Sequence, residues 1–231
     1  MFILCWSAKG GSGTTVVAAT LGLLAARAAP TTLIDLGGDV PAALGVAEPA
    51  GPGVFEWLAA PTASGEALLR LGSPVVEGLQ LVHRGTVAGR AASDGSNLLA
   101  GPDAGGWNRI IEACVDADAH VIIDAGPMHP PDHVHQRADH SLLVTRPCYL
   151  ALRRASSTGV ADVATAAVLV TEPGRALDAS DVERALGLAV VAEVPWDPAV
   201  ARAVDAGLLT ARLPAALAKP LRFLVSNEFA A

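Results

Sequence analysis

Cysteine and basic residues are scarce in this 231-residue sequence. The three cysteines, Cys5, Cys114 and Cys148, are widely separated and lack metal-ligand spacing, so we expect reduced thiols and no disulfide framework. Sixteen Lys and Arg residues stand against 23 Asp and Glu residues, and the formal net charge is −7. The overall field of the protein therefore repels nucleic acid and anionic membranes, which disfavours a role in coating DNA.

A hydrophobic run long enough to span a bilayer is also lacking. Met1–Trp6 is short and carries no basic leader, and the next apolar segment is interrupted by Arg27. We therefore expect a cytoplasmic protein whose membrane contact is at most peripheral. Apolar residues make up 52% of the chain, enough to bury one substantial core, so we expect residues 1–231 to form a single domain.

A glycine loop lies between the apolar run Met1–Trp6 and the Ala-rich segment Val16–Ala29, which predicts strand, loop and helix in that order. Glycines allow positive φ, so successive N–H groups can surround phosphate oxygens at the positive end of the helix. A phosphate-binding loop requires Lys and then Ser or Thr after its last glycine, but Thr14 occupies the lysine position. The predicted phosphate-binding residues are Lys9, Gly10, Gly11, Ser12, Gly13, Thr14 and Thr15. The alternative is a glycine turn with a structural role alone.

Two predicted strands end in a carboxylate. Thr31–Leu36 carries Asp35, and His120–Asp124 is an apolar strand followed by Gly126. Carboxyl ends of parallel strands form the edge where open α/β sheets bind ligands. We expect Asp124 to hold a Mg²⁺-bound water beside the hydroxyl of Thr15. An isolated acid such as Asp35 also occurs as a helix cap or a surface residue.

The alternation of apolar strands with helices predicts an α/β fold, with a predominantly parallel sheet covered by helices on both faces. Pro61–Gly106 is rich in Pro and Gly and yields no assignment apart from a strand at Leu79–His83. The other predicted elements are a helix at Trp107–Asp116, a strand at Ala138–Pro147, a helix at Cys148–Val160, a strand at Ala166–Thr171, a helix at Asp178–Gly187 and a strand at Leu188–Val194.

Lys9 at the front of the loop is the mark of the deviant Walker A motif, Lys-Gly-Gly-x-Gly-Lys-Thr. With this loop and the two strand-end acids, the chain resembles the ParA/MinD family of P-loop ATPases from Phe2 to about Leu224. The resemblance implies a Rossmann-like three-layer fold, ATP or ADP with Mg²⁺ as cofactors, and a nucleotide-dependent homodimer. It further implies that Lys9 reaches the partner's nucleotide and that Asp35 joins Thr15 and Asp124 at the Mg²⁺ site. The catalytic residues that it implies are Lys9, Asp35 and Asp124.

Three positions depart from the family pattern. Thr14 replaces the loop lysine, and Gly37 replaces the second acid of Asp-x-Asp, for which Asp39 can substitute only if its loop shifts by two residues. Thr171 stands where the family has an Asn that reads adenine.

The family's loop beside the nucleotide base has a counterpart in this chain. Pro195-Trp196-Asp197 resembles the family's loop at that position, so we expect Thr171, Pro195 and Trp196 to lie beside the base. The alternative for Trp196 is a surface side chain packed on a proline.

The departures indicate a degenerate family member that positions or assembles other machinery and hydrolyses ATP weakly or not at all. Pro41–Ala60 resembles the corresponding region of the MinD/CpaE branch more than that of the plasmid ParA proteins. We place the chain nearest the CpaE/TadZ branch, which implies pilus or other polar machinery. The main alternative is an active dimeric ATPase in which Lys9 acts in trans. An ATP-dependent biosynthetic ligase is disfavoured because no separate substrate-binding domain is visible.

Sets of polar residues in this sequence have more than one interpretation. One stretch is crowded with polar residues, which suits either a transition metal or, as we prefer, a polar switch or dimer-facing loop. These residues are His129, Asp132, His133, His135 and His140. A basic cluster formed by Arg146, Arg153 and Arg154 suits either an acidic partner or a solvated helix face. A further basic group suits either contact with phosphate or a partner or, as we prefer, a solvated loop. This group is His83, Arg84 and Arg90.

Overall fold

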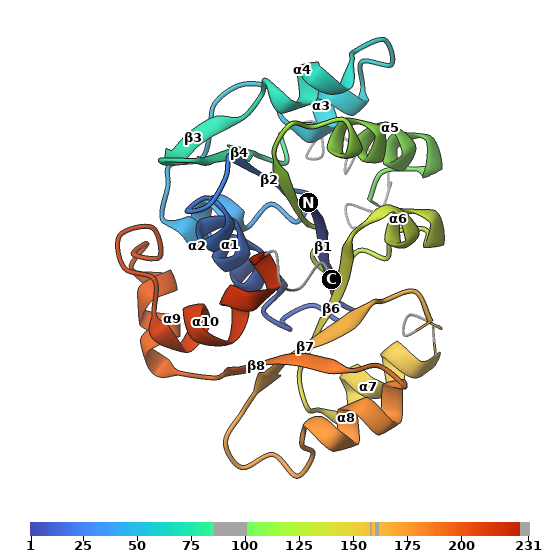
Figure 1. The fold of residues 1–231 in the computed structure, drawn as a ribbon, viewed down its shortest axis with the longest axis vertical. Helices are drawn as coiled ribbons and strands as arrows, with labels where there is room; N and C mark the ends of the chain where they lie inside the picture. Colours follow the sequence, from blue (N-terminus) through green and yellow to red (C-terminus); the bar gives the residue numbers. More distant parts are fainter. Residues whose placement is uncertain (86–100, 158, 160–161, 227–231) are drawn as a thin grey trace, which may run out of the picture.

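The computed structural model describes residues 1–85, 101–157, 159 and 162–226. They form an eight-stranded sheet of order β3-β4-β2-β5-β1-β6-β7-β8, in which only β3 runs antiparallel to its neighbour (Figure 1). The strands are β1 (Phe2–Trp6), β2 (Thr31–Asp35), β3 (Ser73–Val76), β4 (Leu79–Val82), β5 (His120–Asp124), β6 (His140–Thr145), β7 (Ala166–Thr171) and β8 (Val190–Pro195). The predicted α/β fold with a predominantly parallel sheet is confirmed.

Helices cover both faces of this sheet (Figure 1). One face packs against α1 (Thr14–Ala25), α2 (Val40–Leu44), α9 (Pro198–Asp205), α10 (Ala215–Leu221) and the short helix η4 (Arg222–Val225). The other packs against α3 (Val54–Leu58), α4 (Gly65–Leu69), α5 (Ala104–Val115), α6 (Asp132–Arg137), α7 (Tyr149–Ser157) and α8 (Ala179–Leu186).

The central strand β1 explains why its sequence is apolar throughout. Phe2, Leu4 and Trp6 belong to the core under α3–α8, whereas Ile3 and Cys5 belong to the core under α1 and α2. Successive side chains of a strand point to opposite faces, so a strand covered on both sides requires a continuous hydrophobic run. All five residues are buried, and β1 is held firmly below the glycine loop.

Strand order places the ligand-binding edge at the loop that follows β1. The chain first adds strands on the β5 side of β1 and later adds β6, β7 and β8 on the other side. Open parallel sheets bind ligands outside the carboxyl ends of the strands where the order reverses in this way. Cα positions pair in register from Cys5 to Asp124 and from Asp124 to Asp35, so both acids lie level with the start of the loop.

Local structure differs from expectation in two segments. The unassigned stretch contains α4 and β3, which were missed because a five-residue helix and a four-residue strand show no clear periodicity; Arg90 lies outside the described residues. The histidine-rich stretch forms α6 where a loop was expected, and His135 is buried in it. Its ring lies within hydrogen-bonding distance of the Ser141 hydroxyl (2.7 Å) and the Pro130 carbonyl (3.0 Å). No helix in the described part of the chain combines the length and apolarity needed to cross a bilayer.

Candidate functional site

The glycine loop leaves open space above its backbone. Gly11 and Gly13 have φ of 77° and 93°, a conformation that glycine adopts without strain. A Cβ atom added at Gly10 or Gly11 would meet nothing within 4 Å. Inside the loop, the Ser12 hydroxyl donates to the carbonyl of Lys9 at 2.7 Å. The geometry therefore allows a ligand to approach the loop backbone directly.

Helix α1 begins at Thr14 and points its N-terminus at this loop. Its N-cap is Gly13, and no side chain caps the first turn. The free N–H groups and the positive end of the helix dipole suit an anion at this position. Thr14 is only 5% exposed, whereas Lys9 is exposed and its Nζ lies 3.5 Å from the carbonyl oxygen of Gly10. The position at which a phosphate-binding loop carries a lysine is thus occupied by a buried, uncharged side chain.

Asp35 and Asp124 lie together at the carboxyl ends of β2 and β5, and both are fully buried. The Asp35 carboxylate accepts hydrogen bonds from the backbone N–H groups of Gly38 (2.6 Å) and Val40 (3.1 Å). Oδ1 of Asp124 accepts from the N–H of Gly126 at 2.9 Å. Its other oxygen, Oδ2, has no hydrogen-bond partner within the described part of the chain. A buried carboxylate oxygen without a partner indicates a position for a cation or an ordered water.

The electrostatics of this pair also favour a cation. The pKa of Asp35 is raised to about 7, because burial and the nearby charge of Asp124 outweigh the lowering effect of the backbone hydrogen bonds. The pKa of Asp124 is raised to about 6, because the effect of burial exceeds the lowering effect of its interaction with the Thr15 side chain. Carboxylate and hydroxyl oxygens are the ligands that Mg²⁺ prefers. The residues present therefore fit Mg²⁺, with Asp124, Asp35 and Thr15 as the group that would hold it.

Gly37 lies against both acids. A Cβ atom built on it would stand 3.6 Å from Oδ2 of Asp124 and 3.7 Å from Oδ1 of Asp35. A carboxylate at this position would join the pair, and glycine leaves that space open. Asp39, the possible substitute, is exposed at the N-cap of α2, so its loop does not shift in the way that substitution requires.

Arg84 supports the loop that contains Gly37. Its Nη1 donates to the carbonyl oxygen of Gly37 at 3.0 Å, and its guanidinium lies over the ring of Phe55 at 5.2 Å from the centroid. The preferred assignment of Arg84 to a solvated loop is therefore wrong. Sequence reasoning missed this role because Arg84 and Gly37 are 47 residues apart and meet only through the pairing of β2 with β4.

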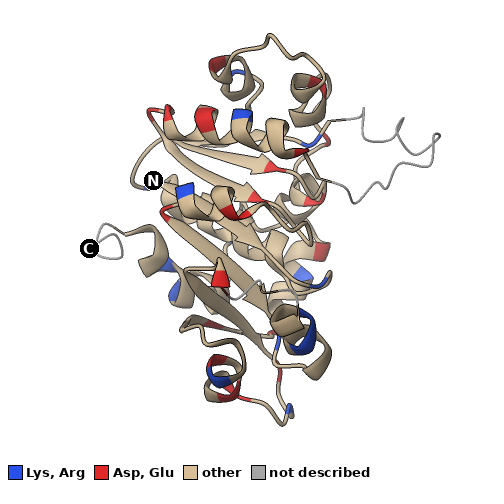
Figure 2. Cartoon of the chain, turned by 90° about the vertical axis from the view of Figure 1, so that its right-hand side faces the viewer, with Lys and Arg blue, Asp and Glu red and all other residues tan. Residues whose placement is uncertain are grey.

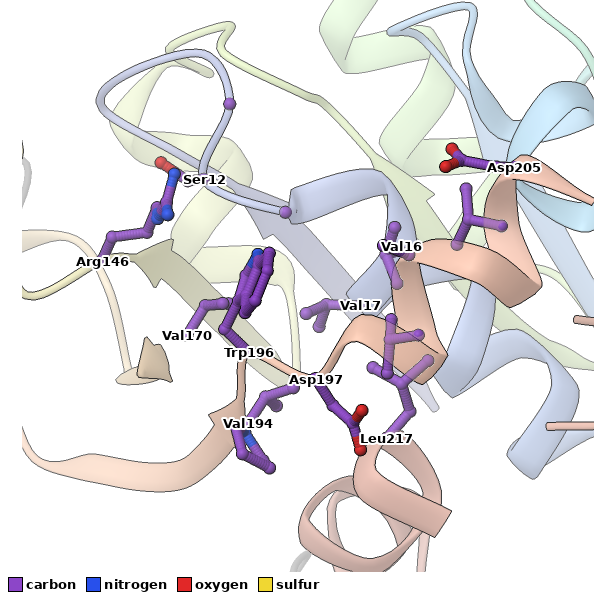
Figure 3. Close-up of a pocket in the computed structure, with 16 residues that line it drawn as sticks. Ser12, Val16, Val17, Arg146, Val170, Val194, Trp196, Asp197, Asp205 and Leu217 are labelled. Carbon is purple, nitrogen blue, oxygen red and sulfur yellow. The ribbon is translucent and has the colours of Figure 1, made fainter. Parts of the chain in front are cut away.

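A cavity of about 240 Å³ opens on the other side of the glycine loop, between the loop, β7 and α9 (Figure 3). Apolar side chains form most of its wall, and Gly11, Ser12 and Gly13 border it. The remaining lining residues are Val16, Val17, Arg146, Val170, Val194, Pro195, Trp196, Asp197, Val200, Ala201, Val204, Asp205 and Leu217. Such a wall next to an anion-binding loop suits a flat aromatic base.

The residues predicted to lie beside the base are only partly brought together. Pro195 and Trp196 line the cavity, and Trp196 keeps 49% of its surface exposed. Thr171 is not among the lining residues: its hydroxyl donates to the Val194 carbonyl at 3.5 Å, and its own carbonyl accepts from the Trp196 N–H at 2.7 Å. Thr171 thus positions the loop that carries Trp196.

Arg146 lines the cavity, although the sequence placed it in a basic surface cluster. The available signal was its position near the end of the strand predicted at Ala138–Pro147. The other two members of the cluster, Arg153 and Arg154, line a separate shallow hollow on α7 together with Lys9 and Leu150. Within residues 1–85, 101–157, 159 and 162–226, no group of three or more His, Cys, Asp or Glu side chains is arranged to hold a metal ion.

The strand order and the glycine loop after β1 define the class of fold, a P-loop type of α/β fold. No family model matches the sequence, and no curated protein matches it either. Among solved structures, the chain is similar to a ParA family ATPase from Chlorobium tepidum, with 16% identity, a TM-score of 0.73 and 96% of each chain covered.

Two MinD structures show the same similarity. MinD from Pyrococcus horikoshii in complex with Mg-ADP is 17% identical at a TM-score of 0.71, covering 96% of this chain and 93% of that one. The MinC:MinD complex of Aquifex aeolicus is 18% identical at a TM-score of 0.71, covering 96% and 94%. The chain therefore has the ParA/MinD fold.

Proposed function

We propose that this chain is a degenerate nucleotide-binding protein of the ParA/MinD type. It acts as a positioning or assembly switch, or as a scaffold, for pilus or other polar machinery of the kind served by the CpaE/TadZ branch. It binds ATP or ADP with Mg²⁺ and hydrolyses ATP weakly or not at all. We treat residues 1–231 as one domain.

The observation that carries this proposal is the incomplete set of charges around an open glycine loop. The loop, the uncapped start of α1 and the buried acid pair supply a place for phosphates and Mg²⁺. Position 14 holds a buried threonine in place of a cation, and position 37 holds glycine beside the two acids. Phosphoryl transfer to water needs positive charge on the leaving oxygen and an oriented water, so loss of one such group typically slows it about a thousandfold.

A protein partner is favoured over nucleic acid. Acidic and basic residues are interspersed on the side of the chain that Figure 2 shows, and the net charge of −7 opposes binding to phosphate backbones. The ParA/MinD fold supports a homodimer that forms when nucleotide binds.

A second candidate function is an active dimeric ATPase in which Lys9 completes the partner's site. Lys9 is exposed at the front of the loop, and within the described residues its ammonium group contacts a single carbonyl, that of Gly10. A lysine placed in this way is available to a second subunit. This candidate predicts measurable turnover that Lys9→Ala abolishes.

Calorimetric titration of the purified protein with ATP and Mg²⁺, run beside light scattering, tests the proposal. We expect heat of binding and a shift in mass from monomer to dimer, with turnover close to the uncatalysed rate. Substantial turnover that depends on Lys9 would support the second candidate instead. Absence of both heat and mass change at millimolar ATP would rule out the switch and leave a scaffold that does not respond to nucleotide.

A further inference from the structure

The cavity beside the glycine loop has a single cationic side chain in its described lining, that of Arg146. In the view of Figure 3, this side chain extends from the end of β6 toward Ser12. Its Nη2 forms an ion pair with Glu172, at the end of β7. The cavity therefore contains a guanidinium group held at the border between the loop and the apolar wall.

Strand register explains why Arg146 reaches this place. Trp6 of β1 pairs with Leu143 of β6, and Arg146 follows Leu143 by three residues, as Lys9 follows Trp6. Both residues thus leave the sheet at the same edge. The acid pair lies on the other side of β1, because Asp124 ends β5, which flanks β1 on the side opposite β6. The glycine loop accordingly has carboxylates on one side and a guanidinium group on the other.

Charge balance leaves Arg146 available to an anion. Glu172 pairs with both Arg146 and Arg175, so the three side chains together carry a net charge of +1. A guanidinium group has five N–H donors, and apart from Nη2 those of Arg146 donate to no group in the described part of the chain. Arg146 can therefore donate to a phosphate while it keeps its bond to Glu172.

We propose that Arg146 binds the phosphate nearest the ribose of the bound nucleotide. This inference rests on the proposed function. Val170 and Trp196 in the same cavity offer an apolar surface for the base, and the guanidinium group lies beside Ser12 of the loop. Thr14, the position of the missing lysine, does not line the cavity. The cation of this chain is thus displaced from the bond that hydrolysis breaks, and it contributes to binding and not to turnover.

Affinities for a series of ligands test this assignment. The intact protein and its Arg146→Ala and Arg146→Lys variants are titrated with ATP, ADP, AMP and adenosine, each with Mg²⁺. A charge-assisted hydrogen-bond pair predicts that Arg146→Ala weakens all three phosphorylated ligands by about tenfold to a hundredfold and leaves adenosine within about twofold. Arg146→Lys keeps the charge without the planar fork and recovers part of the loss.

A variant with the opposite effect sharpens the test. Glu172→Gln removes the competing carboxylate and increases the local positive charge, so affinity for AMP, ADP and ATP rises about threefold or more without a rise in turnover. Arg184→Ala is the matched control for Arg146→Ala, because Arg184 is exposed on α8, pairs with Asp181 and lies outside the cavity lining. It removes the same positive charge as Arg146→Ala and leaves all four affinities within about twofold.

The outcomes separate the two proposals. If the unchanged protein binds none of the four ligands, the proposed function fails and this inference fails with it. If the unchanged protein binds ATP and Arg146→Ala binds it equally well, only this inference fails. If Arg146→Ala weakens adenosine as much as AMP, Arg146 contacts the base or supports folding, and the assignment to a phosphate is also overturned. Thermal unfolding of both Arg146 variants distinguishes a contact with the base from a role in folding.

Discussion

The two sides of the glycine loop differ in charge, burial and completeness. On the β5 side, Asp35 and Asp124 are fully buried and face a position occupied by Gly37. On the β6 side, Arg146 and half-exposed Trp196 border an open cavity with an apolar wall. Under the proposed function, the first side would hold the metal and lacks one acid, whereas the second would hold the base and a phosphate. On that proposal, nucleotide binding and hydrolysis depend on different sides of the loop.

Closing the loop that joins the two sides gives the largest expected effect. Gly13→Val places a β-branched side chain at a φ of 93°, with its Cβ 3.4 Å from Cγ2 of Val170. We expect ATP affinity to fall more than about a hundredfold in a calorimetric titration, because the anion cradle and the cavity are lost together.

Gly187→Val is the matched control for that change. Gly187 also has positive φ, 65°, but it ends α8, and a Cβ atom there meets nothing within 4 Å. Both variants pay about 1–3 kcal/mol of backbone strain, and only Gly13→Val should lose affinity. Equal affinities would show that the loop does not bind the nucleotide.

Completing the acidic side is expected to restore hydrolysis. Thr14→Lys supplies the missing cation, and Gly37→Asp supplies a carboxylate on a Cβ atom that lies at ordinary contact distance from Asp124. The double variant should raise ATP turnover by about a hundredfold in a phosphate-release assay, since two groups that act on the transition state return together.

Thr14→Ala with Gly37→Ala controls for changes in packing at the same positions and should leave turnover at the level of the unchanged protein. Restored turnover in that alanine pair would contradict the explanation by charge. If the variant with Thr14→Lys and Gly37→Asp shows no gain in ATP turnover, another part of the site limits hydrolysis.

Removing one carboxylate should affect metal-dependent binding alone. Asp124→Asn eliminates the charge of the oxygen that lacks a partner, so the increase in ATP affinity caused by Mg²⁺ should shrink about tenfold. Titrations with EDTA and with Mg²⁺ measure this difference directly. Affinity without metal should stay equal or rise slightly, and a loss of metal-free affinity instead would indicate a purely structural role for Asp124.

The smallest expected effect is on thermal stability. The pKa values of Asp35 and Asp124 in the folded protein, about 7 and about 6, lie above the ordinary value of 3.8. Folding therefore favours the protonated acids, and their contribution to stability is present below about pH 4 and is lost as pH rises toward 7. We expect the Tm to fall by several degrees between pH 5 and pH 8, and Mg²⁺ to reverse part of that fall.

Asp35→Asn should flatten this pH dependence, whereas Asp118→Asn, at an exposed acid, should not. Unfolding curves followed by circular dichroism at several pH values supply the comparison. An identical slope in the two variants would mean that the buried pair does not limit stability.

The sequence by itself determined the parts of the site that depend on local order. Glycines at 10, 11 and 13 before an Ala-rich segment specify a strand, loop and helix, and the structure has them at β1 and α1. Apolar runs ending in Asp35 and Asp124 specify strands whose last residue carries an acid. Backbone conformation and hydrophobic periodicity follow from neighbours along the chain, so these features were predictable.

Only the tertiary structure decided which distant residues meet. Arg146 enters the cavity because β6 pairs with β1, Arg84 reaches Gly37 because β4 pairs with β2, and Thr171 bonds across to β8 instead of lining the cavity. His135 is buried against Ser141, although its histidine-rich surroundings predicted a polar loop. These contacts depend on strand order and on packing between faces of the sheet, which no local pattern of residues encodes.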